Sequence, residues 1–96
     1  NKLENFNKLI LSNYKYIDKI KSITNINILI INGLKNINKI DHIKFENINQ
    51  IDLKNCARID SCKILQNIKK VRISGGNHWS HIKYICELEY LERCKF

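Results

Sequence analysis

The feature that most constrains the fold of this chain is a set of apolar positions that recurs at a nearly constant interval. Leu9 recurs as Leu29, then as Ile51 and then as Val71. Within each set the apolar residues advance mostly in steps of three, which slip by roughly 60° per step on an α-helix and soon wrap its cylinder. The chain must therefore turn often and keep one face inward. The four sets are Phe6, Leu9, Leu11, Tyr14, Ile17, Ile20 and Ile23; Ile26, Leu29, Ile31, Leu34, Ile37, Ile40 and Ile43; Ile48, Ile51, Leu53, Cys56, Ile59, Cys62 and Leu65; and Ile68, Val71, Ile73, Gly76, Trp79, Ile82 and Ile85.

Each set contains one step of two, which is the alternation of a β-strand. We therefore expect one short strand in each coil. A residue that tolerates positive φ follows at the same place in every set and should end the strand there. Later positions such as Ile17, Ile20 and Ile23 suit short turns or 3₁₀ segments, in which residues three apart face alike. The steps of two are Leu9 to Leu11, Leu29 to Ile31, Ile51 to Leu53 and Val71 to Ile73, and the turn pairs are Ser12-Asn13, Asn32-Gly33, Lys54-Asn55 and Ser74-Gly75.

These sets predict one domain made of stacked coils. The coils span about residues 3–23, 24–43, 44–65 and 66–85, and a partial last coil, 86–96, begins with Leu88 and Leu91 and breaks at Arg93. The third coil is longer by two residues near Phe45 to Asn47. Because neighbouring repeats stay in register, we expect this insertion to bulge on the side away from the strands.

The pattern Ile48-x-x-Ile51-x-Leu53-x-x-Cys56 resembles the signature of leucine-rich repeats, and the tandem matches cover nearly the whole chain. The resemblance implies a repeat solenoid, a right-handed superhelix of the β/α type, whose parallel strands line a concave, partner-binding face. The chain departs from the family at Tyr14, Leu34 and Gly76, which stand where the family has its asparagine ladder. A parallel β-helix is the structural alternative.

The positions between the inward ones define the predicted concave face. This face is apolar in the first two coils and charged in the next two, a combination typical of a protein interface with apolar anchors and a polar rim. Ile10, Ile28 and Ile30 also have another explanation: the rest of a longer chain would cover them, or they are present only for their β-propensity. One column is Lys8, Ile28, Gln50, Lys70 and Tyr90, the next is Ile10, Ile30, Asp52, Arg72 and Glu92, and the residues predicted to bind a partner are Lys8, Ile10, Ile28, Ile30, Gln50, Asp52, Lys54, Lys70, Arg72 and Tyr90.

Composition limits the other classes of function. A hydrophobic content of 44% excludes a disordered polar tail, and no apolar run is long enough to span a membrane. The net charge of +8 makes an electrostatic binder of nucleic acid or an acidic surface the third hypothesis, although Asp52 and Glu92 interrupt a basic stripe. The second is a structural scaffold that self-associates through an apolar last coil, which contains Leu88, Tyr90, Leu91 and Phe96.

The sequence offers no recognisable catalytic arrangement, so we expect neither enzymatic activity nor a metal or cofactor. Ser74-Gly75-Gly76 is too short for a phosphate-binding loop. Cys56 and Cys62 stand at inward positions, where cysteine packs as a small hydrophobe. Cys86 and Cys94 lie outside that register, and we expect reduced thiols, which favours an intracellular location. The spacing of His78, His81 and Cys86 is explained by a surface loop. With Asn1 first and no methionine, we expect a fragment or a trimmed product.

Overall fold

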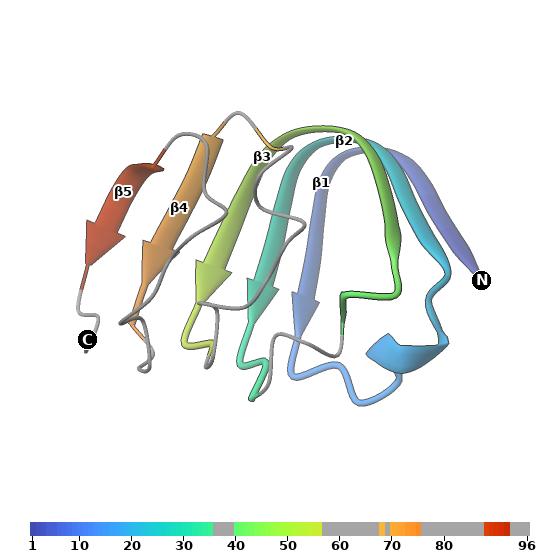
Figure 1. Cartoon of the computed structure of the whole chain (residues 1–96), viewed down its shortest axis with the longest axis horizontal. Helices are drawn as coiled ribbons and strands as arrows, with labels where there is room; N and C mark the ends of the chain where they lie inside the picture. The colour runs from blue at the N-terminus through green and yellow to red at the C-terminus, as the bar shows by residue number, and fades with distance from the viewer. Residues whose placement is uncertain (36–39, 57–67, 69, 76–87, 93–96) are drawn as a thin grey trace.

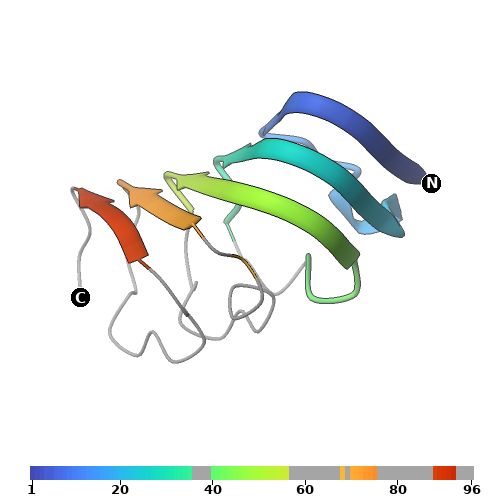
Figure 2. The same ribbon diagram turned by 90° about the horizontal axis from the view of Figure 1, so that it is seen from above.

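Five parallel strands form the described part of the protein. In the computed structural model, residues 1–35, 40–56, 68, 70–75 and 88–92 are described, the last range by its backbone alone. The strands hydrogen-bond in sequence order, and Figures 1 and 2 show them side by side in an arched sheet, with the connection from β1 to β2 beneath it. The elements are β1 (Lys2–Ser12), the 3₁₀ helix η1 (Ile17–Lys19), β2 (Ser22–Asn32), β3 (Lys44–Lys54), β4 (Lys70–Ser74) and β5 (Leu88–Glu92).

The pairing of the strands confirms the spacing seen in the sequence. Leu9 pairs with Leu29, Leu29 with Ile51, and Ile51 with Val71, so the equivalent apolar positions of successive coils lie side by side. The last pair departs from this period, because Ile73 pairs with Leu91 and the register shifts between Val71 and Arg72. The described chain is therefore a parallel sheet with little helix, compatible with a repeat solenoid.

The two extra residues do not lie where the sequence analysis put them. Phe45 to Asn47 are part of β3, with Phe45 opposite Ile23, so the prediction of a bulge there was wrong. The insertion belongs instead to the connection from β2 to β3, residues 33–43, which is two residues longer than the connection 13–21. A paired strand cannot gain residues without losing its register, whereas a connection can.

The first three strands are longer than expected, because each bends in the middle and then continues. β1, β2 and β3 have 11 residues each. Asn5, Asn25 and Asn47 have φ of 66°, 57° and 55°, in the left-handed region that asparagine tolerates best among side-chain-bearing residues. This conformation interrupts the alternation, so Ile23 and Ile26 both face the core although they are three residues apart, with 0% and 1% exposure. The bend produces the arch of Figure 1.

A second column of positive φ ends the strands, as the sequence predicted. Its members are Asn13, Gly33, Asn55 and Gly75. Their backbones continue the ladder past the strands: the Asn13 amide donates to Asn32 O at 2.8 Å and the Gly33 amide to Lys54 O at 2.9 Å. We refer below to Asn5, Asn25 and Asn47 as the mid-strand column, and to these four residues as the strand-end column.

The core lies beneath the arch and consists mostly of isoleucine. Burying each such side chain stabilises the fold by roughly 1.5–3 kcal/mol. Two predicted core residues are wrong: Phe6 and Tyr14 are both 44% exposed, because they belong to the first coil of the described stack and are covered from one side only. The predicted positions at Ile37, Ile59, Cys62, Leu65, Gly76, Trp79, Ile82 and Ile85 lie outside the described residues. The buried apolar residues include Leu11, Ile17, Ile20, Ile23, Ile26, Leu29, Ile31, Ile40, Ile43, Ile48, Ile51, Leu53, Cys56, Ile68, Val71 and Ile73.

The connection from β1 to β2 contains the short 3₁₀ segment expected from the spacing of three. The Ile20 amide donates to Ile17 O at 3.2 Å, and the Ile43 amide repeats this bond to Ile40 O at 3.1 Å in the next connection. Within the described ranges, no helix is long and apolar enough to cross a membrane.

Candidate binding surface

The structure brings the predicted partner-binding residues together in adjacent rows on the strands. Strand pairing aligns Lys8, Ile28, Gln50 and Lys70 in one row, and Ile10, Ile30, Asp52 and Arg72 in the next. Lys54 belongs to a third row, beside Asn32 and Ser74. These rows alternate with the buried residues, so they occupy the outer side of the sheet. Along the strands this side is the outside of an arch (Figure 1).

The fifth strand enters these rows at a different place from the one predicted. Tyr90 pairs with Arg72 and not with Lys70, and Glu92 pairs with Ser74 instead of Arg72. The shift arises because β5 begins 18 residues after β4, whereas the predicted column assumed an interval of 20, and the irregularity between Val71 and Arg72 changes the pairing by one residue more. The predicted column ending in Lys70 and Tyr90 is therefore corrected.

The apolar part of the surface is smaller than predicted. Ile10 is 56% exposed, and Ile28 is half-buried. Ile30 was expected in the same exposed patch, but only 8% of its surface is exposed. A central strand has neighbours on both sides that cover its residues, whereas β1 is the first strand of the sheet and Ile10 is covered from one side only. We call Lys8, Ile10 and Ile28 the outer patch.

The polar part of the surface is centred on Asp52, whose residue exposure is only 9%. The Gln50 amide donates to Asp52 Oδ1 at 2.8 Å, which satisfies part of the buried carboxylate. The register also places Arg72 directly beside Asp52. Lys54 and Lys70 are exposed on the neighbouring rows. The acidic residue is thus held inside the surface, while the lysines remain accessible to a partner.

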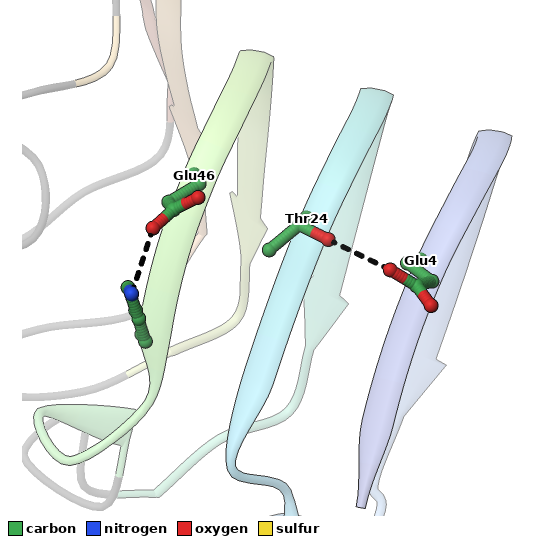
Figure 3. A network of polar contacts seen from close by, with 4 residues as sticks. Glu4, Thr24 and Glu46 are labelled. Carbon is green, nitrogen blue, oxygen red and sulfur yellow. Dashed lines mark hydrogen bonds and ion pairs between the residues drawn. The ribbon is translucent and has the colours of Figure 1, made fainter.

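The first halves of the strands display a row of alternating acidic and hydroxyl groups. Glu4, Thr24 and Glu46 stand side by side, and Figure 3 shows the Thr24 hydroxyl directed at the Glu4 carboxylate, a long contact of 3.5 Å. Glu46 pairs with Lys44 at 2.9 Å, with side chains 57% and 72% exposed. Such exposed pairs contribute less than about 1 kcal/mol. This row therefore affects the charge of the surface more than its stability.

Two ladders of asparagine side chains cross β1, β2 and β3 beside this row. In the first, Asn25 Nδ2 donates to Asn5 Oδ1 at 3.0 Å, and Asn47 Nδ2 donates to Asn25 Oδ1 at 2.9 Å. In the second, Asn27 donates to Asn7 at 3.1 Å and Asn49 donates to Asn27 at 3.0 Å. The backbones of β1 and β2 are not paired at Asn5 and Asn25, nor at Asn7 and Asn27. The side-chain amides therefore bridge the strands where backbone pairing is interrupted.

Sequence reasoning missed these ladders because it looked for asparagine at another register. An asparagine ladder was expected just after the strands, at the positions that Tyr14, Leu34 and Gly76 occupy in this chain. The signal was present as a recurring Asn-apolar-Asn triplet with the spacing of the coils. The triplets are Asn5-Phe6-Asn7, Asn25-Ile26-Asn27 and Asn47-Ile48-Asn49.

Two hollows accompany these features. A shallow groove of about 380 Å³ runs between the asparagine ladders, with Phe6 and Ile26 in its lining. A deeper one of about 390 Å³ lies at the strand ends of the first two coils, lined by Leu11, Tyr14 and Lys15 among others. The Tyr14 and Tyr16 rings meet edge to face at 6.1 Å, and Lys15 Nζ is 5.1 Å from the centre of the Tyr16 ring. Both hollows are open to solvent, so neither encloses a small molecule as a ligand pocket does.

Cys56 packs in the core, as expected from its inward position. Its residue exposure is 0%, and Sγ lies 3.5 Å from Ile31 O and 3.4 Å from Lys54 O. Burial raises the pKa of the Cys56 thiol, which keeps it protonated and unreactive near neutral pH. The described residues contain no group of three or more His, Cys, Asp or Glu that could hold a metal ion. The other positions considered for this chemistry, Cys62, His78, His81, Cys86 and Cys94, lie outside the described residues.

Comparison of the chain with models of protein families, with curated proteins and with solved structures gave no match.

Proposed function

We propose that this chain is a protein-binding module whose outer patch contacts a partner. The observation that carries the proposal is Ile10, a β-branched side chain that is 56% exposed on a regular strand. It lies two residues from the exposed Lys8, and the half-buried Ile28 faces Lys8 across the strand pair. An apolar anchor flanked by a flexible cation is the arrangement that protein interfaces use for affinity at the centre and steering at the rim.

The polar rows extend this surface toward β4. Lys54, Lys70 and Arg72 supply positive charge, and Gln50 holds Asp52 in place among them. A partner with an apolar residue at Ile10 and acidic residues opposite the lysines would match both parts. In this proposal Ile30 and Asp52, which are largely buried in the same row as Ile10, support the exposed residues around them. Tyr90 extends the surface beside Arg72.

The finer fold assignment is part of the same proposal. We propose a leucine-rich-repeat solenoid, supported by the sequential parallel strands, their regular spacing along the chain and the 3₁₀ segment in the first connection. The parallel β-helix alternative is supported by one specific observation, the bend at the mid-strand column, which gives each of the first three coils two strand segments. Both assignments place the outer patch on the same side of the sheet.

The test is capture of partners from an extract of the source cells by immobilised wild-type chain, in low and in high salt, followed by mass spectrometry. Ile10→Ser removes the anchor, and Tyr16→Ser is the matched control because Tyr16 is also exposed, at 52%, but lies off the sheet. A protein retained in high salt by the wild type and by Tyr16→Ser, but not by Ile10→Ser, is the expected result. Equal retention by Ile10→Ser would refute the outer patch as the site.

A separate experiment tests the charged half. Reversal of charge at Lys70 and Arg72 should weaken the captured interaction, with circular dichroism as the check that the variant remains folded. Unchanged affinity would remove these residues from the site. If every captured component is lost in high salt, the electrostatic hypothesis based on the net charge of +8 replaces the apolar one.

A further inference from the structure

We propose that Asn32-Gly33 is a modification site, at which Asn32 loses its side-chain amide to attack by the backbone nitrogen of Gly33 when the end of β2 opens. The pair lies at the end of a strand that has β1 on one side and β3 on the other. It is the one place in the sequence where glycine directly follows asparagine. The reaction takes water as its co-reactant, and its product is an acidic residue at position 32.

The chemistry depends on the missing side chain of Gly33. Its backbone nitrogen attacks Asn32 Cγ, so that an N–Cγ bond forms and the Cγ–Nδ2 bond breaks. The proton of the attacking nitrogen leaves with Nδ2 as ammonia, and a cyclic imide remains. Water then opens the imide at either carbonyl and gives aspartate or isoaspartate, with no change of oxidation state. A side chain on the following residue hinders the attack, so Asn13, which precedes Tyr14, is a much poorer site.

Three hydrogen bonds hold the reacting groups apart in the folded chain. The Gly33 amide donates to Lys54 O at 2.9 Å, which engages the proton that the nitrogen must lose. Asn32 Nδ2 donates to Ser12 Oγ, and Asn32 Oδ1 accepts from Asn55 Nδ2, each at 3.2 Å, so the side chain is fixed between the first and third coils. Ring closure also requires Asn32 to rotate out of its extended strand conformation. The rate of attack therefore follows the population in which this strand end is open.

The two products differ in whether the strand end can close again. An aspartate at position 32 still accepts from Asn55 Nδ2, and the Ser12 hydroxyl can turn to donate to it. Isoaspartate instead carries the main chain through its side-chain carbon, which inserts an extra backbone atom before Gly33. This insertion displaces the Gly33 amide from Lys54 O. The modification thus records an opening of the strand end and, in the isoaspartyl form, prevents its closure.

The test compares the folded chain with the chain unfolded in guanidinium chloride, at the same pH and temperature. Peptide mapping by mass spectrometry gives the rate of amide loss at Asn32, and an isoaspartyl methyltransferase quantifies that product. We expect the loss to be at least about tenfold slower in the folded chain, because only the open fraction reacts. Equal rates in the two states would overturn the protection. In the unfolded chain Asn32 should react well before Asn13, and equal rates at these two residues would overturn the site itself.

A double variant tests whether the side-chain bonds provide the protection. Ser12→Ala removes the acceptor of Asn32 Nδ2, and Asn55→Gly removes the donor to Asn32 Oδ1 while keeping the positive φ of residue 55. Each lost bond should raise the rate of amide loss in the folded chain by about two- to tenfold. The rate in the unfolded chain should not change, because these bonds do not exist there.

The matched control is Asn25→Gly, in the same strand. It also loses two hydrogen bonds between side chains, but neither involves Asn32. Urea denaturation gives the free energy of unfolding of both variants, so that their rates can be compared at known stability. We expect faster amide loss in the double variant than in Asn25→Gly. If both variants accelerate the loss in proportion to their fall in stability, global unfolding sets the rate and the role of the strand-end bonds is refuted.

Discussion

The mid-strand and strand-end columns place the same backbone conformation at two points of each of the first three coils, but they use different residues. The mid-strand column is asparagine in all three coils, whereas the strand-end column alternates Asn13, Gly33, Asn55 and Gly75. In the first, the side-chain amides bond one another from β3 to β2 and from β2 to β1. In the second, the asparagine oxygen occupies the space that a Cβ on the glycine of the next coil would need.

The difference shows that positive φ alone does not determine the residue. Where the side chain bridges two strands, glycine would satisfy the backbone and lose the bridge. At the strand ends, the asparagine oxygen lies where the Cβ of the equivalent residue in the next coil would be, so that residue must be glycine. The contrast can be tested by exchanging residues between the columns and measuring the free energy of unfolding in urea.

The largest effect is expected for Gly33→Ala. Alanine at φ of 80° is strained, and its Cβ would overlap Asn13 Oδ1, so the variant should lose roughly 2–3 kcal/mol. Urea denaturation measures this loss. In the background of Asn13→Gly the overlap disappears and only the strain remains, so the same substitution should cost less. If the losses in free energy of unfolding from Gly33→Ala and Asn13→Gly simply add in the double variant, the overlap with Asn13 Oδ1 is not the cause.

A somewhat smaller loss is expected for Asn25→Gly. This change preserves the backbone conformation but removes two exposed ladder bonds, one donated to Asn5 and one accepted from Asn47, for a cost of about 1–2 kcal/mol. Asn25→Ala should lose more in the same denaturation experiment, because it adds strain to the loss of the bonds. If Asn25→Gly is as stable as the wild type, the ladder does not stabilise the fold.

The same substitution in the strand-end column should have little effect. Asn13 makes no side-chain hydrogen bond to the described residues, and glycine accepts its φ of 49° without strain. Asn13→Gly should therefore stay within about 0.5 kcal/mol of the wild type, which is measured in the same urea series. A loss as large as that of Asn25→Gly would show that the two columns are equivalent and would remove the distinction.

Near neutral pH the smallest effect is expected at Cys56, which follows the strand-end column. Burial raises the pKa of this thiol, so the folded chain holds the proton more tightly than the unfolded one. The resulting stabilisation is complete below the pKa of the unfolded chain and is lost as the pH rises through the folded pKa. Stability of the wild type should fall more steeply in the alkaline range than that of Cys56→Val. Parallel curves of urea midpoint against pH would contradict this assignment.

Much of the fold was predictable because it depends on periodic burial. The steps of two located the second halves of the strands, and the Asn or Gly at residues 13, 33, 55 and 75 marked their ends. The first halves were missed because asparagine disfavours strands, and only the bond to the neighbouring coil compensates. The insertion was misplaced for a related reason: apolar spacing fixes the period but does not say which segment holds the extra residues.

The candidate surface was predictable in its rows but not in its exposure. Counting along the coils aligned Lys8, Ile28 and Gln50 correctly. The same count failed at Tyr90, because it assumed an interval of 20 residues where β5 follows β4 after 18. The burial of Ile30 depends on strands on both sides and is a property of the sheet, which no single coil reveals.

The alternation of asparagine and glycine at the strand ends has a consequence for how such an array can change in length. Asn13 is followed by Gly33 in the next coil, and two coils further along Asn55 is followed by Gly75 in the same way. Duplication of one coil ending in asparagine would place two asparagines in succession, with an oxygen where the second Cβ must be. Duplication of two coils preserves the order. A coil that ends in asparagine can therefore be duplicated only together with the glycine-ending coil that follows it.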